Sequence, residues 1–387
     1  MFKIQTLNKI SPRGLNLLSH DKYEYASEII NPDAILVRSQ DMLKMELPDT
    51  LKAIARAGAG INNIPVARCS ERGIVVFNTP GANANGVKEL VIAGLLLSSR
   101  KIFEGINWAK TLSGKGSEVP ALIEKGKTNF DGPEIKEKKL GVIGLGAIGV
   151  MVANDAESLG MEVSGYDPFL SVESAWGLSR TIKKAISLDS LLADADFISL
   201  HIPLNDNTRN LLKKEKFALM KKGVKILNFS RAELVNNADL KDAIDQGIVS
   251  VYVTDFPNDE LLKMNNVIPI PHLGASTPES EENCAIMAVN QVGDFLENGN
   301  VKNSVNFPDC ILPRSGTRRI VIANRNVPNM IGQITPVLAK HNINIADMLN
   351  KSKGDFAYNI IDIDNEVNGE VIKELKAING IVMVRLV

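Results

Sequence analysis

The sequence has few cysteines and no long apolar run. Its 387 residues include three cysteines, Cys69, Cys284 and Cys310, which lie far apart. An odd and widely spaced set predicts neither a disulfide framework nor a metal site, and it suits a reducing cytoplasm. No apolar run reaches the roughly 18 residues of a membrane-spanning helix. The N-terminal residues also lack the apolar segment of a signal peptide, so we expect a cytoplasmic protein that does not act at a membrane.

An excess of one charge is also missing. The 44 lysines and arginines nearly balance the 45 aspartates and glutamates, and the basic residues form no block. We therefore expect no nucleic-acid partner. The composition of the chain, 44% hydrophobic and 23% charged residues, is typical of a soluble globular protein. The length of the chain predicts two or three domains.

The most informative stretch is 138–168. It contains a short apolar run, a glycine triplet, a helical run and a second apolar run, at 140–143, 144–149, 150–159 and 162–166. Strand, glycines in G-x-G-x-x-G spacing, helix and strand in this order predict a dinucleotide-binding fold. The structural alternative is a tight turn between strand and helix that binds no ligand.

Each glycine of the triplet has a physical role in such a fold. Gly144 permits the tight turn, Gly146 lets a pyrophosphate approach the backbone, and Gly149 lets the helix and the strand pack closely. Ala147 and Ile148 begin the helix, and the free N–H groups at its start are expected to bind the cofactor phosphates.

An acidic residue completes the pattern. Asp167 follows the second strand, 18 residues after Gly149. A carboxylate at this place is expected to accept a hydrogen bond from a ribose 2′-OH, and it would repel a 2′-phosphate. The sequence therefore predicts NAD rather than NADP as the cofactor.

Alternating strand and helix patterns predict an α/β protein with two doubly wound, Rossmann-like parallel sheets. The expected strands of the first sheet are 34–37, 51–55 and 74–77, followed by a helix at 85–101 and a loop at 114–129. Six strands are expected in the second sheet, from 141–143 to 267–269. A helix that begins at 276 should return the chain to the first domain, and the last seventy residues predict a ferredoxin-like βαββαβ unit. The predicted domains are 1–95 with 283–316, 96–282, and 317–387.

Polar residues follow several strands of the second sheet, at the edge where open α/β sheets bind ligands. Arg231, Asp255, Glu260 and His272 come shortly after three of these strands. A histidine can accept a hydroxyl proton while a hydride leaves, a carboxylate can support it, and an arginine can bind a substrate carboxylate. Each of these residues could instead be an ordinary surface residue. His201, at another strand end, is expected to line the cofactor.

These residues resemble the D-isomer-specific 2-hydroxyacid dehydrogenases over the first 310 residues. The matching segments are Gly144 to Gly149, Tyr166-Asp167-Pro168, Leu200-His201-Ile202-Pro203, Asn228-Phe229-Ser230-Arg231 and Pro271-His272-Leu273-Gly274. The resemblance implies a catalytic trio at Arg231, Glu260 and His272, with Asp255 contacting the cofactor. Ala232 replaces the glycine that the family usually has, and an alignment on Phe256-Pro257 would move the acid from Glu260 to Asp259.

Loops of the first domain resemble the branch of the family that oxidises D-3-phosphoglycerate to 3-phosphohydroxypyruvate, the first committed step of L-serine synthesis. Arg38, Ser39, Arg56 and Asn78 lie on these loops and are expected to bind the substrate. Two arginines also suit a doubly charged phosphate. The alternatives are a related dehydrogenase of glycerate, glyoxylate or lactate, and a non-enzymatic NAD-sensing protein.

The last seventy residues resemble an ACT regulatory domain. The resemblance implies an L-serine effector held by Asn326 and Asn344 between two chains, in a homodimer or homotetramer. Members of the branch that bind an effector carry a histidine two residues before the first asparagine, and Asn324 stands there in this sequence. Serine feedback is therefore an expectation that rests on the two asparagines.

Overall fold

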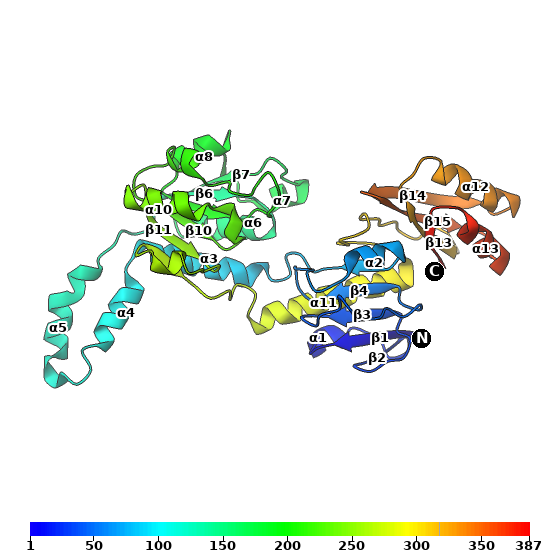
Figure 1. Cartoon of the computed structure of the whole chain (residues 1–387), viewed down its shortest axis with the longest axis horizontal. Helices are drawn as coiled ribbons and strands as arrows, with labels where there is room; N and C mark the ends of the chain where they lie inside the picture. Colours follow the sequence, from blue (N-terminus) through cyan, green and yellow to red (C-terminus); the bar gives the residue numbers. More distant parts are fainter. Residues whose placement is uncertain (317) are drawn as a thin grey trace. The chain divides into compact units, whose positions relative to one another are not determined.

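A computed structural model describes residues 1–316 and 318–387. By its contacts the chain divides into two compact units, Met1–Asn83 with Pro278–Val387, and Ala84–Thr277. The predicted fold class, two parallel sheets and a smaller antiparallel one, is confirmed (Figure 1). The predicted three domains, with boundaries near 95, 282 and 316, stay a prediction. Among the described residues no helix is long and apolar enough to cross a membrane.

The first sheet has five parallel strands in the order β2-β1-β3-β4-β5. They are β1 (Phe2–Leu7), β2 (Tyr23–Ala26), β3 (Ala34–Val37), β4 (Ala53–Arg56) and β5 (Val75–Phe77). The helices of this part are α1 (Pro12–Leu15), α2 (Val66–Glu71) and the long α11 (Pro278–Asn298). The sequence did not predict β1 and β2. In β1 only Ile4 is fully buried, and the strand FKIQTL contains no continuous apolar run that would indicate a buried strand.

The second sheet has seven strands in the order β12-β11-β10-β9-β6-β7-β8, and every pair is parallel. They are β6 (Lys139–Ile143), β7 (Glu162–Tyr166), β8 (Lys183–Lys184), β9 (Phe197–Leu200), β10 (Val224–Asn228), β11 (Val249–Thr254) and β12 (Val267–Pro269). The α-helices are α3 (Ala84–Ser99), α6 (Ala147–Ser158), α7 (Val172–Gly177), α8 (Leu188–Asp194), α9 (Lys214–Phe217) and α10 (Asn237–Asp245), with 3₁₀ turns η3 (Ala232–Leu234) and η4 (Leu261–Lys263). The strand order reverses between β6 and β9, where such sheets bind their ligands.

The expected loop at 114–129 is wrong, because this stretch is largely helical. With the preceding helix it forms an arm of α4 (Ile102–Lys110), η1 (Gly116–Glu118), α5 (Val119–Gly126) and η2 (Lys127–Phe130), which extends away from the second sheet (Figure 1). The rings of Trp108 and Phe130 lie 5.2 Å apart. A side chain at Gly126 would come within 2.3 Å of Trp108. One of the glycines that indicated a loop, Gly126, therefore makes room for an aromatic ring.

The C-terminal segment forms an antiparallel sheet in the order β14-β15-β13-β16. Its elements are β13 (Arg318–Arg325), α12 (Met330–Lys340), β14 (Ile345–Lys353), β15 (Phe356–Ile363), α13 (Gly369–Ala377) and β16 (Ile381–Leu386). This is the predicted βαββαβ order. Buried residues of its strands pack with the two helices in one core, and others, including Val321 and Tyr358, belong to the core of the first sheet.

Polar side chains of this sheet also bind the end of α11. Arg319 donates to the carbonyl of Asn298 at 2.9 Å, and the Tyr358 hydroxyl donates to the carbonyl of Gly299 at 2.8 Å. Arg385 donates to Phe295 and lies over its ring. The last carbonyls of a helix have no partners within the helix, so the C-terminal sheet supplies them here. The segment is therefore bonded to the first sheet's long helix.

Candidate functional site

The glycine loop after β6 has the geometry that its spacing predicts. Gly144 has φ +92°, and a side chain there would lie 2.5 Å from the carbonyl oxygen of His201. A side chain at Gly149 would lie 1.9 Å from the Gly144 oxygen. At Gly146, in contrast, a Cβ would meet nothing within 4 Å. Two glycines thus allow close packing, and the third leaves the open space in which a pyrophosphate could approach the backbone.

The start of α6 adds electrostatic support for a phosphate. Gly146 is the N-cap residue and has no side chain, so it does not cap the first N–H groups of the helix, which begins with Ala147 and Ile148. Asp167, at the end of β7, accepts hydrogen bonds from Leu145 N and Phe169 N, both at 2.8 Å. The carboxylate is therefore held beside the glycine loop, where the sequence predicted a ribose contact.

His201 ends β9 on the other side of the switch point. Its backbone N–H donates to Ile143 at 2.7 Å, and its Nε2 lies 2.8 Å from the Ser199 hydroxyl. Burial of the ring lowers the pKa of His201 to about 4. The imidazole is therefore neutral near pH 7 and a poor proton acceptor there, and its predicted contact with the cofactor stays a prediction.

Arg231, Asp255 and His272 follow three neighbouring strands, β10, β11 and β12. Asp255 is only 3% exposed, and burial raises its pKa above the ordinary value, while the charges of His272 and Arg231 act in the opposite direction. Its Oδ1 has no hydrogen-bond partner among the described residues. A buried acceptor without a partner is unfavourable, so a donor on a bound molecule fits this place. Together with the open space at Gly146, this unpaired oxygen fits a dinucleotide cofactor.

His272 is exposed and packs edge-on against Phe256, with ring centroids 4.9 Å apart. Phe256 is in turn bound through its backbone N–H to the Thr254 hydroxyl at 3.1 Å. The sequence did not predict a role for Phe256, which entered only through the alternative alignment of the acid. Its contact holds the imidazole ring near the end of β12.

Among the residues that the structure describes, Glu260 forms no hydrogen bond with His272. Glu260 instead accepts a hydrogen bond from Asn237 at 3.2 Å. Asp259, the alternative acid, is 85% exposed and pairs with Lys263 on the following turn. The choice between Glu260 and Asp259 therefore stays a prediction. Hydrogen bonds between catalytic groups are often long before a substrate binds.

The predicted substrate residues lie at the ends of β3, β4 and β5 in the other compact unit. Arg56 donates from Nε to the carbonyl of Arg38 at 2.9 Å, and burial lowers its pKa from the ordinary value. A side chain at Gly60 would lie 2.4 Å from its Nη1. Asn78 donates to the carbonyl of Ala59 at 2.7 Å. The structure thus brings Arg38, Arg56 and Asn78 together through their loops.

Some partners of these residues were not found in the sequence. Glu281, in the first turn of α11, accepts a hydrogen bond from Arg38 at 2.6 Å. Asn8 accepts one from the backbone N–H of Ser39 at 3.1 Å. The sequence separation between Arg38 and Glu281 is large, and no local pattern links them. Only the packing of α11 on the sheet reveals the pair.

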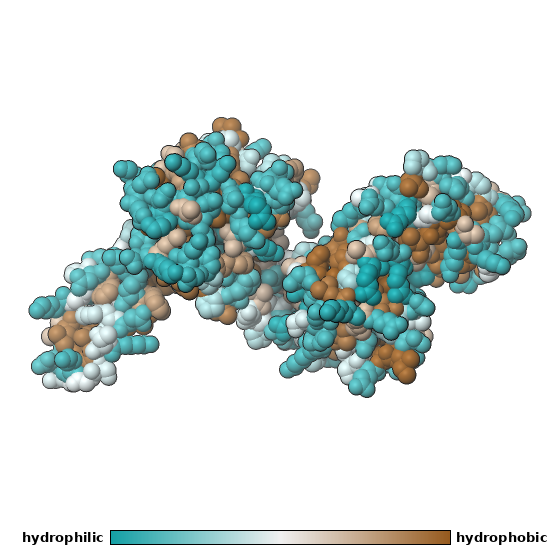
Figure 2. All heavy atoms as spheres, in the orientation of Figure 1, coloured by the Kyte–Doolittle hydropathy of each residue, from teal (hydrophilic) through white to brown (hydrophobic). Residues whose placement is uncertain are grey.

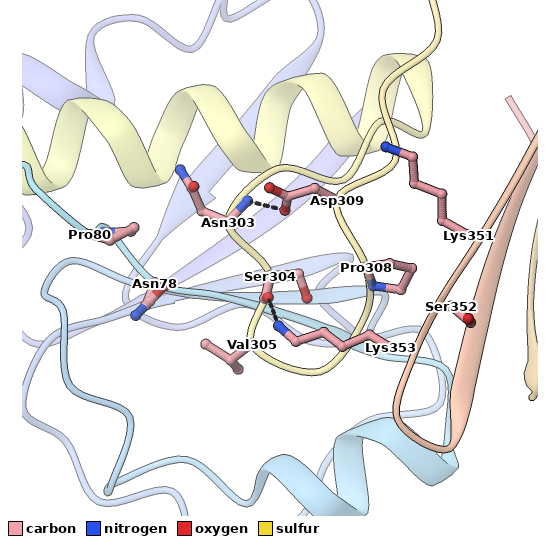
Figure 3. Close-up of a pocket in the computed structure, with 10 residues that line it drawn as sticks. All are labelled: Asn78, Pro80, Asn303, Ser304, Val305, Pro308, Asp309, Lys351, Ser352 and Lys353. Carbon is pink, nitrogen blue, oxygen red and sulfur yellow. Dashed lines mark hydrogen bonds between the residues drawn. The ribbon is translucent and has the colours of Figure 1, made fainter. Parts of the chain in front are cut away.

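A cavity of about 790 Å³ adjoins Asn78 (Figure 3). It lies between Asn78 and Pro80, the segment that begins at Asn303, and the end of β14. The Lys353 ammonium group donates to the carbonyl of Ser304 at 2.8 Å across its rim. The C-terminal segment therefore reaches the immediate surroundings of a predicted substrate residue.

The two predicted effector residues lie at opposite ends of the C-terminal sheet. Asn326 directly follows Arg325 of β13, which pairs with Phe356 at the start of β15. Asn344 directly precedes Ile345 of β14, which pairs with Ile363 at the end of β15. Seven strand positions separate these pairs, about 23 Å at roughly 3.3 Å per residue. One small molecule could not bind both within one chain, so a site between two chains stays a prediction. Asn324 is buried and accepts a hydrogen bond from Asn359 at 2.7 Å.

Comparison with known proteins identifies close sequence relatives. The family model described as "D-isomer specific 2-hydroxyacid dehydrogenase, NAD binding domain" matches residues 92–274. A D-3-phosphoglycerate dehydrogenase of Archaeoglobus fulgidus is 36% identical over 298 residues, 74% of this chain and 53% of that protein. One from Escherichia coli K12 is 31% identical over 382 residues, 95% of this chain and 89% of that protein. The chain thus spans about half the length of the first relative and most of the second.

Solved structures share the fold. The crystal structure of NAD⁺-bound 3-phosphoglycerate dehydrogenase from Entamoeba histolytica has a TM-score of 0.59 at 27% identity, over 79% of this chain and 98% of that chain. D-mandelate dehydrogenase from Rhodotorula graminis has a TM-score of 0.65 at 22% identity, which shows the fold only. These matches confirm the predicted dinucleotide-binding architecture.

Proposed function

Because the chain belongs to the D-isomer specific 2-hydroxyacid dehydrogenase family, we propose that it oxidises D-3-phosphoglycerate to 3-phosphohydroxypyruvate with NAD, the first committed step of L-serine synthesis. The relatives named above carry this activity in their names. The observation that supports it most directly is the position of Arg231, Asp255 and His272 at neighbouring strand ends of an NAD-binding sheet.

The reaction divides among these residues by their chemistry. The glycine loop and Asp167 would hold NAD, which when bound would supply the hydride acceptor for the carbon that carries the substrate hydroxyl. His272, exposed at the end of β12, takes the hydroxyl proton, since an imidazole titrates near neutral pH. The Arg231 side chain is exposed, and within residues 1–316 and 318–387 it donates only to the carbonyl of Ser230, so its remaining N–H groups can bind the substrate carboxylate. Glu260, which accepts a hydrogen bond from Asn237, is assigned the role of supporting the histidine.

The direct test is the reverse reaction. The purified chain should consume NADH with 3-phosphohydroxypyruvate far faster than with hydroxypyruvate, glyoxylate or pyruvate. Preference for an unphosphorylated 2-oxo acid would identify another dehydrogenase of the family. Binding of NADH without turnover of any of the four compounds would indicate a cofactor-sensing protein instead.

Arg38 and Arg56 provide a test of the phosphate contact. Each charge-assisted hydrogen bond contributes roughly 1.5–3 kcal/mol, or about tenfold or more in affinity. Arg38→Ala is therefore expected to raise the KM for 3-phosphohydroxypyruvate by about tenfold or more. The KM for hydroxypyruvate, which has no phosphate, should change much less. Arg56→Ala should have the same effect on both KM values. Arg72→Ala, which removes a pair with Asp49, is the control. Equal losses for both substrates would show that these arginines bind the carboxylate or only hold the loop.

Asp167 provides a test of cofactor choice. Its carboxylate is held beside Leu145, where it can accept a ribose hydroxyl and repel a 2′-phosphate. Asp167→Ala should weaken NAD binding and reduce the preference for NAD over NADP, both measured by fluorescence titration of the reduced cofactors. A wild-type protein that binds both cofactors equally would contradict the assignment. Asp189→Ala, on a surface helix of the same sheet, serves as the control.

Glu260 and Asp259 can be separated by the pH dependence of turnover. A carboxylate that supports protonated His272 keeps the histidine from acting as a base at low pH. Glu260→Gln should therefore move the acid limb of the oxidation profile to lower pH, and Asp259→Asn, which breaks only the exposed pair with Lys263, should not. The opposite pattern would place the acid one residue earlier.

We also propose that the protein assembles as a homodimer or homotetramer and that L-serine binds at Asn326 and Asn344 between chains. Support for assembly comes from the arm, in which no residue of α4 or α5 is buried and Phe103 is 61% exposed. Hydrophobic residues gather on this arm (Figure 2). Exposed apolar surface of this kind marks interaction sites. Light scattering should give a mass in solution of two or four chains. In a separate test, Asn344→Ala should relieve the inhibition of turnover by L-serine.

A further inference from the structure

A second cavity, of about 620 Å³, lies along one side of α11 within the unit that contains the first sheet. Five residues of its lining carry the argument: Asn283, Asn290, Gln291, Asp294 and Lys302. Asn283, Asn290 and Asp294 lie on α11 at spacings of seven and four residues, so they share one side of the helix, and Gln291 lies next to Asn290. Asn303 borders both this cavity and the one near Asn78, and its side chain points toward α11 (Figure 3).

Gln291 is the central feature of this cavity. It is only 8% exposed, and its Nε2 donates to the backbone carbonyl of Asn78 at 3.0 Å. Its Oε1 has no hydrogen-bond partner among the described residues. A buried acceptor without a partner is unfavourable, and a bound molecule with an N–H or O–H group would satisfy it. The bond to Asn78 orients this amide and leaves Oε1 as the group that a bound molecule would satisfy.

Opposite charges line the same cavity without pairing. Asp294 accepts hydrogen bonds at Oδ1 from Asn298 and Asn300, at 2.8 and 3.1 Å, which leaves Oδ2 available. Across residues 1–316 and 318–387, neither Asp294 nor Lys302 forms an ion pair, and the side chains of Asn283 and Asn290 form no hydrogen bond. The cavity thus offers an anion, a cation and free amides that can donate and accept.

We propose that this cavity binds a small zwitterion of the α-amino acid class. Asp294 would receive its ammonium group, Lys302 its carboxylate, and Gln291 a donor group. The site is distinct from the predicted effector positions Asn326 and Asn344, and its existence does not depend on the proposed reaction. Because Gln291 also holds the carbonyl of Asn78, occupancy would fix the loop that carries a predicted substrate residue.

Calorimetry tests the proposal without measuring activity, and it uses the full chain with Asn344→Ala so that the separately proposed site between chains does not contribute. The probes are L-serine and two analogues that each lack one of its charges, ethanolamine and 3-hydroxypropionate. L-serine should bind saturably at millimolar concentration or below, and each analogue should bind at least about tenfold more weakly, as expected when one charge-assisted contact is lost. No serine binding, or equal binding of all three probes, would overturn the proposal.

Variants locate the bound molecule. Lys302→Met changes an exposed side chain and should weaken serine binding by about tenfold, removing the advantage over ethanolamine. Gln291→Met removes the buried acceptor, and Asn290→Ala gives a second, exposed variant in case Gln291→Met does not fold. Lys373→Met on α13 is the matched control. If serine binding is lost in Asn344→Ala and unchanged in Lys302→Met and Asn290→Ala, the bound molecule lies at the ends of the C-terminal sheet and the proposal is wrong.

Discussion

Replacement of His272 by alanine is expected to lower turnover of 3-phosphoglycerate by about two to four orders of magnitude, the usual contribution of a general acid–base group. The affinity for NADH should change little, because the glycine loop and Asp167 are untouched by the substitution. Steady-state kinetics measure the first effect, and a fluorescence titration with NADH measures the second.

The other three histidines of the chain are controls for this result. His341 pairs with Glu374 in the C-terminal segment, and His20 stacks on Tyr25. His341→Ala and His20→Ala should leave turnover nearly unchanged. His201 has a pKa of about 4 and is a poor proton acceptor at neutral pH, so His201→Asn should act mainly on cofactor binding. A His272→Ala enzyme with near-normal turnover would mean that another group takes the proton.

Much of the fold could be predicted because its signals are local. The glycine triplet, the strand before it and Asp167 lie within thirty residues of one another, and the structure arranges them as their spacing requires. Strands β9 to β12 are short apolar runs that end in polar residues, so the positions of Arg231, Asp255 and His272 at one sheet edge followed from the parallel order. Local pattern and global fold agree in this part of the chain.

The remaining features depend on contacts that no local pattern contains. Gly126 indicated a loop, but it accommodates the ring of Trp108 in the arm. Partners far apart in sequence, such as Glu281 for Arg38 and Gln291 for Asn78, appear only when α11 lies on the first sheet. Tertiary packing overrides the usual meaning of a glycine or a surface charge at these positions.

The C-terminal segment illustrates the same limit and carries the last prediction. The sequence indicated a separate βαββαβ unit after a linker, yet Arg319 and Asp362 form an ion pair in which both side chains are 0% exposed. Nε and Nη2 of Arg319 bind the two carboxylate oxygens at 2.6 and 2.9 Å, and Nη1 reaches Asn298 of α11. Burial acts to raise the pKa of Asp362, but hydrogen bonds from Arg319 and Ser315 outweigh it and lower the pKa.

Breaking this pair should be strongly destabilising. Arg319→Met keeps much of the side-chain volume but leaves a buried carboxylate without its partner, which costs about 3–5 kcal/mol. The free energy of unfolding of the first-sheet unit, measured by urea denaturation, should fall by this amount. Arg318→Met is a closely matched control, because the adjacent Arg318 forms an exposed pair with Glu366 and should contribute less than about 1 kcal/mol.

The stabilisation by this pair should depend on pH in one direction. A carboxylate whose pKa is lower in the folded chain stabilises the protein above its unfolded pKa, about 3.9, and this stabilisation is lost as the pH falls through the folded value. The difference between wild type and Arg319→Met should therefore be full at neutral pH and shrink in acid, where Asp362 becomes protonated. A double variant, Arg319→Met with Asp362→Leu, removes both charges and should recover much of the lost stability. Equal stability of Arg319→Met and Arg318→Met at neutral pH would show that the buried pair does not hold the C-terminal sheet to α11.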